Sequence, residues 1–98
     1  MNFRLWTEVA EKYEKVLVLQ PNDWRALWKW GSGLCIQAKA SSVGQAFLLY
    51  KLACEKLLQA ANIMPNFKTL YNAGNAHLHF AKLIGKNFIR NNRTVIHS

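Results

Sequence analysis

Few side chains in this sequence could carry out chemistry, and their spacing argues against a catalytic or metal site. His77 and His79 are two residues apart, which places them on different faces of a helix, and no third ligand lies near them in the sequence. The chain has only five acidic residues, no nucleophile paired with a base, and no glycine-rich phosphate loop. We therefore predict a protein that is not an enzyme and uses no metal or cofactor, with His77 in the core.

The two cysteines, Cys35 and Cys54, each lie within an apolar stretch with helical spacing. Buried free thiols pack as small apolar groups, and we favour this interpretation over a disulfide. It fits a reducing intracellular compartment, the cytoplasm by default or an organelle interior if the chain is a fragment. No apolar run approaches the ~20 residues of a membrane span, and the first residues lack the apolar core of a secretory signal.

Charge is distributed unevenly along the chain. Residues 1–23 carry three basic and four acidic side chains, whereas residues 24–98 carry ten basic side chains and one acidic one. This asymmetry favours an acidic partner, which could be a protein segment, a nucleic acid or a lipid headgroup. A merely soluble basic surface is the plainer alternative, because the basic residues are dispersed.

Apolar residues recur at three- and four-residue steps and predict four helices and no strands. The expected helices cover about residues 3–19, 24–39, 45–64 and 67–84. Asp23 is a suitable N-cap for the second helix, and residues 41–44 form the turn before the third. Gly85 is placed to end the fourth, so we expect a helical domain over residues 1–85 and a frayed basic tail over residues 86–98.

An internal repeat relates the two halves of the chain. The pattern Tyr13-x2-Val16-x2-Leu19-x-Pro21-Asn22 recurs as Leu57-x2-Ala60-x2-Ile63-x-Pro65-Asn66, and each copy is followed by an apolar stretch that contains glycine. Self-similarity of this kind indicates stacked units that cannot bury their apolar faces alone. The predicted fold is all-α, with antiparallel helix hairpins stacked as a short α-solenoid. In each unit a small residue would let two helices cross closely.

This pattern resembles the tetratricopeptide repeat family, whose unit is a helix–turn–helix of about 34 residues. Leu27-x2-Trp30-Gly31-x2-Leu34 is similar to the first-helix motif, and Ala53-x3-Leu57 with Ala60 and Pro65 is similar to the second. The resemblance covers about residues 5–85 as half a repeat, a full repeat and another half. The residues that define it are Tyr13, Pro21, Leu27, Trp30, Gly31, Leu34, Ala53, Leu57, Ala60, Pro65, Leu70, Gly74 and His77. By this resemblance His77 stands where the family has a core tyrosine.

The resemblance implies a non-catalytic scaffold that binds a peptide segment or partner helix on a concave face formed by the first helices of the repeats. On this chain that face would be drawn from Arg25, Trp28, Lys29, Ser32, Lys68, Tyr71, Asn72 and Asn75. An acidic peptide is the favoured partner, and an ordinary solvated face is the alternative for each residue. A helical-repeat RNA binder, using the basic surface with Trp24 and Trp28 as stacking platforms, is the second functional hypothesis. Self-association through the uncovered last helix is also expected.

Overall fold

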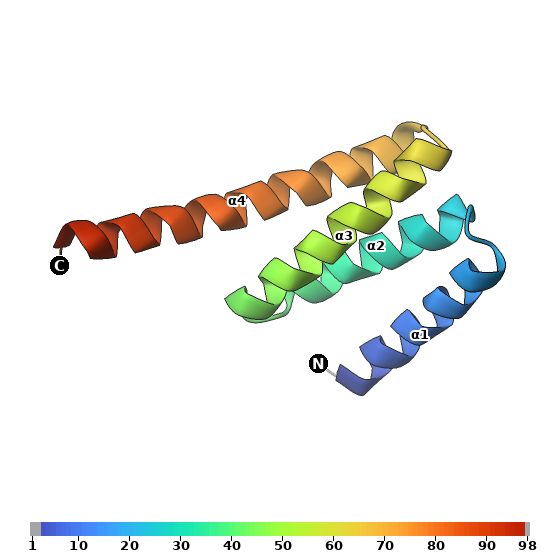
Figure 1. The fold of residues 1–98 in the computed structure, drawn as a ribbon, viewed down its shortest axis with the longest axis horizontal. Coiled ribbons are helices and arrows are strands. Elements are labelled where there is room, and N and C mark those ends of the chain that lie inside the picture. Colours follow the sequence, from blue (N-terminus) through green and yellow to red (C-terminus); the bar gives the residue numbers. More distant parts are fainter. Residues whose placement is uncertain (1–2, 98) are drawn as a thin grey trace.

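Four α-helices in sequence account for almost all of the described chain (Figure 1). The structure, a computed structural model, describes residues 3–97, with side chains described over residues 5–86. The helices are α1 (Phe3–Leu19), α2 (Trp24–Lys39), α3 (Val43–Ile63) and α4 (Phe67–His97), and no strand occurs over residues 3–97. The predicted all-α class with four main helices is confirmed.

The turns between helices are set by proline and by side-chain caps. Pro21 and Pro65 lie in the turns after α1 and α3, where the missing amide proton and fixed φ disfavour a continued helix. Asp23 Oδ1 accepts a hydrogen bond from the Ala26 amide at 3.2 Å, which confirms the predicted N-cap of α2. The turn before α3 is shorter than predicted, because Val43 and Gly44 already belong to that helix.

A reciprocal cap starts α4. Asn66 Oδ1 accepts the Thr69 amide proton at 2.9 Å, and Thr69 Oγ1 accepts the Asn66 amide proton at 3.0 Å. The Thr69 hydroxyl also lies 2.7 Å from the Met64 carbonyl oxygen, to which it can donate. Thr69 is completely buried, so this single side chain ties the end of α3 to the start of α4.

The helices are stacked in chain order. α2 and α3 form the central hairpin, α1 packs on α2, and α4 packs on α3 with a smaller contact to α2 (Figure 1). The molecule is elongated, with extents of 53 × 31 × 17 Å, because α4 reaches well beyond the other three helices. Most buried side chains lie on α2 and α3, which are covered from both sides.

Small residues let α2 and α3 approach closely, as predicted for Gly31. A Cβ added at Gly31 would lie 2.5 Å from Leu57 Cγ and 3.3 Å from the Ala53 carbonyl oxygen. Ala53, Leu57 and Ala60 are at most 1% exposed, and Trp30 is buried beside them. The α2 residues that define the repeat pattern, Leu27, Trp30, Gly31 and Leu34, are all buried.

The sequence predicts an inner face of α4 formed by Leu70, Ala73, Gly74, His77 and Ala81, and this face is wrong in its rotation about the helix axis. Leu70 is 56% exposed, His77 is exposed, and a Cβ at Gly74 would meet nothing within 4 Å. Of the predicted residues only Ala73 is buried, and Thr69 and Ala76 are buried with it on the side toward α3. The reason is that α4 has only one helical neighbour of substantial contact, so it buries the face toward α3 and leaves the face that carries the motif residues open.

The predicted end of α4 at Gly85 is also wrong, because the helix continues to His97. A glycine costs only about 1 kcal/mol relative to alanine inside a helix, so it does not by itself end one. Gly85 has no positive φ and therefore does not adopt the left-handed cap that the prediction assumed. The division into a domain over residues 1–85 and a basic tail over residues 86–98 stays a prediction, since the side chains of residues 87–98 lie outside the described part.

Candidate functional site

A groove runs between α2 and α4, with a side chain of α3 at its base. We call this cavity of about 210 Å³ the α2–α4 groove. It brings together three residues that the sequence predicted for a binding face, namely Ser32, Asn72 and Asn75. Its other lining residues are Cys35, Ile36, Lys39, Leu57, Ala76 and His79. The groove therefore combines an apolar base with amide, hydroxyl, imidazole and ammonium groups.

Two polar atoms at this place are buried without a hydrogen-bond partner among the described residues. They are the indole nitrogen of Trp28 and the hydroxyl oxygen of Ser32, one turn apart on α2. Leaving such a group unpaired costs about 1–3 kcal/mol, so polar side chains in this position are unusual unless something compensates them. Trp28 packs against the core cluster formed by α3 and α4, while Ser32 lines the groove itself.

One asparagine of the groove, Asn72, already makes a hydrogen bond within its own helix. Asn72 Nδ2 donates to the Lys68 carbonyl oxygen at 2.8 Å, which fixes the side chain along its own helix. Its Oδ1 is thereby oriented as an acceptor. His79 stacks on Tyr50 with ring centroids 5.9 Å apart, so its ring is held at the edge of the groove by packing. His77 lies on another face and hydrogen-bonds the Ala73 carbonyl oxygen at 2.7 Å.

The remaining predicted face residues do not line the groove. Lys29 lines a different cavity, between α1 and α2. The guanidinium carbon of Arg25 lies 5.4 Å from the ring centroid of Trp24. Tyr71 stacks on Phe67 with the ring centroids 5.7 Å apart. The Lys68 ammonium lies 5.5 Å from the ring centroid of Trp28, where it is attracted by the negative face of the indole. The single concave surface predicted from the sequence is thus divided over separate places.

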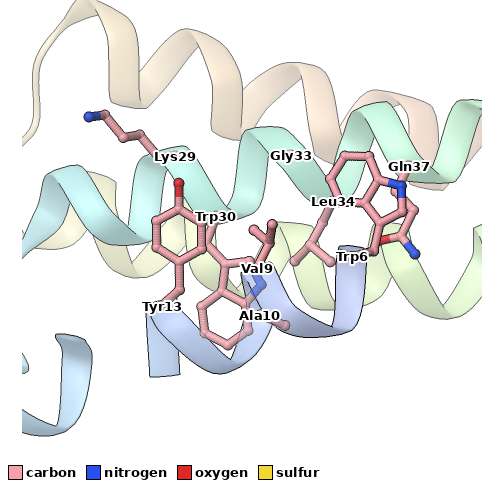
Figure 2. A pocket seen from close by; sticks show the side chains of 9 residues that line it. All are labelled: Trp6, Val9, Ala10, Tyr13, Lys29, Trp30, Gly33, Leu34 and Gln37. Carbon is pink, nitrogen blue, oxygen red and sulfur yellow. The ribbon is translucent and has the colours of Figure 1, made fainter. Parts of the chain in front are cut away.

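The α1–α2 cavity has a volume of about 170 Å³ and is mostly aromatic and aliphatic (Figure 2). Tyr13 stacks on Trp30 at 6.1 Å with the rings 10° from parallel, and Trp6 lies against the other end of the cavity. The Lys29 side chain extends away from these rings. We interpret this space as loose packing between α1 and α2, because its lining offers few polar groups to orient a ligand.

Sequence reasoning missed five groove residues, Cys35, Ile36, Lys39, Ala76 and His79. Ser32, Ile36 and Lys39 follow steps of four and three along α2, and the same spacing extends Asn72 and Asn75 to His79. Extending the predicted face by two helical turns on α2 and by one on α4 would have found Lys39 and His79.

The cysteines near this site are not activated nucleophiles. Both are free, as predicted, with Cys54 buried and Cys35 half-buried. Burial raises the pKa of the Cys54 thiol to about 11. Burial also raises the pKa of Cys35, with the nearby Lys39 ammonium acting in the opposite direction. Because the thiolate is the reactive form, both groups are poor nucleophiles at neutral pH.

Comparison with known protein families, curated proteins and solved structures finds no match to this chain. None of the helices in the described part is long and apolar enough to cross a membrane.

Proposed function

We propose that this protein is a non-catalytic interaction module of the tetratricopeptide type that binds an extended peptide in the α2–α4 groove. The observation that carries the proposal is the convergence of Ser32, Asn72 and Asn75 from two helices that are far apart in the sequence. Amide side chains offer both donors and acceptors and can pair with a peptide backbone. After a rotation about χ1 of Ser32, its hydroxyl could also donate a hydrogen bond to a carbonyl of the entering peptide. This bond would offset the cost of leaving the Ser32 hydroxyl buried and unpaired.

The repeat assignment is supported by contacts that recur along the chain. Ala10, Tyr13 and Leu17 of α1 pack on Trp30 of α2. Their counterparts 44 positions later, Cys54, Leu57 and Ala61 of α3, pack on Ala73 and Ala76 of α4. Side chains at matching positions thus make matching contacts, which is the behaviour of stacked repeats.

Charge favours an acidic peptide. Lys39 lines the groove, and α2 and α4 together contain no aspartate or glutamate. A cleft bordered by charges of one sign attracts ligands of the opposite sign and speeds their association. The RNA hypothesis is weaker on this surface, because stacking on bases needs exposed rings. Trp24 and Trp28 are both half-buried, and their rings are tilted against each other with centroids 6.4 Å apart.

The test is selection of ligands from a displayed library of random dodecapeptides, followed by fluorescence anisotropy with the selected peptides. We expect sequences rich in aspartate and glutamate. The double variant Asn72→Ala/Asn75→Ala should lose at least about tenfold in affinity, the effect of roughly 1.4 kcal/mol. Lys39→Ala should weaken binding and flatten its salt dependence, whereas Lys51→Ala, an exposed change on α3, should have little effect.

Two outcomes would overturn the proposal. One is that the groove variants bind the selected peptides as tightly as the unmodified chain does. The other is that a labelled single-stranded RNA oligomer binds tightly, with affinity falling log-linearly with salt, while no peptide is selected. The second result would favour the RNA-binding hypothesis instead.

A further inference from the structure

The exposed side of α4 carries an apolar face that none of the other three helices covers. We call this face, formed by Phe67, Leu70, Gly74, Leu78 and Ala81, the open face of α4. Phe67 is 81% exposed, Leu70 56% and Leu78 51%, and Gly74 leaves a bare position between them. These spacings of three and four residues place the side chains along one stripe of the helix. An apolar stripe of this length marks an interaction surface.

The corresponding positions of α2 show what kind of neighbour such a face accepts. The counterparts of Leu70 and Gly74, 43 positions earlier, are Leu27 and Gly31, and both are buried. Gly31 lies directly under Leu57 and Ala53 of α3. α2 therefore has two covered faces, one toward α1 and one toward α3. In α4 the face that corresponds to the first of these is covered by α3, but the face that corresponds to the second is open.

The helix that would fit the open face resembles α3, and α1 is the helix of the same kind in this chain. Ala53 and Ala60 of α3, both fully buried, correspond to Val9 and Val16 of α1. Val9 is half-buried at the edge of the α1–α2 cavity and Val16 is 38% exposed, because the main contact of α1 with α2 is made by Ala10, Tyr13 and Leu17. α1 thus has a second side that is only partly covered.

Charge favours this pairing over a symmetric one. α1 is close to neutral, with Glu8, Glu11 and Glu14 against Arg4, Lys12 and Lys15, whereas α4 contains no acidic residue and carries Lys68, Lys82 and Lys86. Two copies of α4 placed against each other would bring like charges together, so an α4–α4 dimer is disfavoured.

We propose that the protein self-associates head to tail, with the Val9 and Val16 side of α1 from a second copy packing on the open face of α4. This contact continues the α2–α3 interface into the next molecule. It is heterologous, so each copy can bind one neighbour at each end and the assembly grows as a chain or closes into a ring. The proposal does not depend on a peptide in the groove.

The experiment is sedimentation velocity on the full chain over a concentration series from low micromolar to near millimolar. We expect the average mass to rise with concentration and to pass that of a dimer. Leu70→Lys and Val16→Lys change exposed positions on the two proposed surfaces, and each alone should reduce association at least tenfold. Leu48→Lys on α3 and Val18→Lys on α1 are matched controls, because both sites are more exposed and lie on other faces. Circular dichroism checks that all four variants fold.

Mixing the two interface variants gives the decisive result. Leu70→Lys retains a normal α1 and Val16→Lys retains a normal α4, so an equimolar mixture should form heterodimers and stop there. If Val16→Lys self-associates like the unmodified chain while Leu70→Lys does not, the contact is a symmetric α4–α4 dimer and the proposal is wrong. A chain that stays monomeric at every concentration would also overturn it.

Discussion

Replacing Gly31 by alanine tests the close crossing of α2 and α3, on which the whole stack depends. The new Cβ would lie 2.5 Å from Leu57 Cγ, 2.8 Å from Leu57 Cδ2 and 3.3 Å from the Ala53 carbonyl oxygen. Leu57 is only 1% exposed, so it cannot move aside without disturbing its neighbours. Overpacking of this kind costs about 1–3 kcal/mol, or somewhat more when the backbone must move. Alanine's better helix propensity offsets about 1 kcal/mol of this cost, so we expect a net loss of up to about 2 kcal/mol.

Gly33→Ala, two residues away on the same helix, is the matched control. There the added Cβ would lie 3.6 Å from Trp6 Cζ3, an ordinary contact at the edge of the α1–α2 cavity. We expect this variant to be more stable than the unmodified chain by up to about 1 kcal/mol. Urea unfolding followed by circular dichroism measures the change in unfolding free energy of both variants. In thermal unfolding, a difference of about 1 kcal/mol corresponds to roughly 4–8 °C in Tm for a domain of this size.

The reasoning fails if Gly31→Ala is as stable as Gly33→Ala, because the crossing would then tolerate a methyl group. A double-mutant cycle localises the effect further. Leu57→Ala removes the atoms that the new Cβ would meet, so in that background Gly31→Ala should lose most of its additional cost. Strict additivity of the two changes would place the strain elsewhere.

Two further predictions concern the α3–α4 junction and the buried thiol. Thr69→Val keeps the shape of a buried side chain but leaves the Asn66 amide and the Met64 carbonyl without their hydroxyl partner, so urea unfolding should show a loss of about 1–3 kcal/mol, and an unchanged stability would contradict the cap. Cys54, whose pKa is raised from 9.0 to about 11 in the fold, should react with a thiol reagent at pH 8 only after unfolding. The raised pKa means that the fold favours the protonated thiol, and the stability gained in this way is complete below pH 9 and is lost as the pH rises toward 11. The urea midpoint of the unmodified chain should therefore fall between pH 9 and pH 11. It should fall less in Cys54→Ala.

The first three helices could be predicted closely because their signals are local and agree with one another. Proline marks the turns after α1 and α3, Asp23 caps α2, and the apolar stripe of α2 has neighbours on both sides. Trp30 and Gly31 are buried as expected, since a helix covered from two sides buries most of its apolar residues whatever its exact rotation.

The rotation of α4 and the composition of the groove could not be predicted in the same way. A helix with one main neighbour buries a single face, and the sequence of α4 offers two apolar faces of similar quality, one through Ala73 and Ala76 and one through Leu70 and Gly74. Which of them meets α3 depends on the packing geometry of the preceding helices. The groove depends on the same geometry, because Lys39 and His79 line one cavity only through the placement of α2 against α4.

The exposed residues of α4 change what a repeat motif can be taken to mean. Leu27 and Gly31 match the first-helix pattern and are buried, whereas Leu70 and Gly74 match the same pattern and are exposed. The pattern therefore specifies which neighbour a side chain fits, and burial follows only where that neighbour is present. On this argument an exposed motif residue indicates an interface that is not satisfied within the four helices. We propose that the open face of α4 is such an interface and that α1 of a second copy covers it.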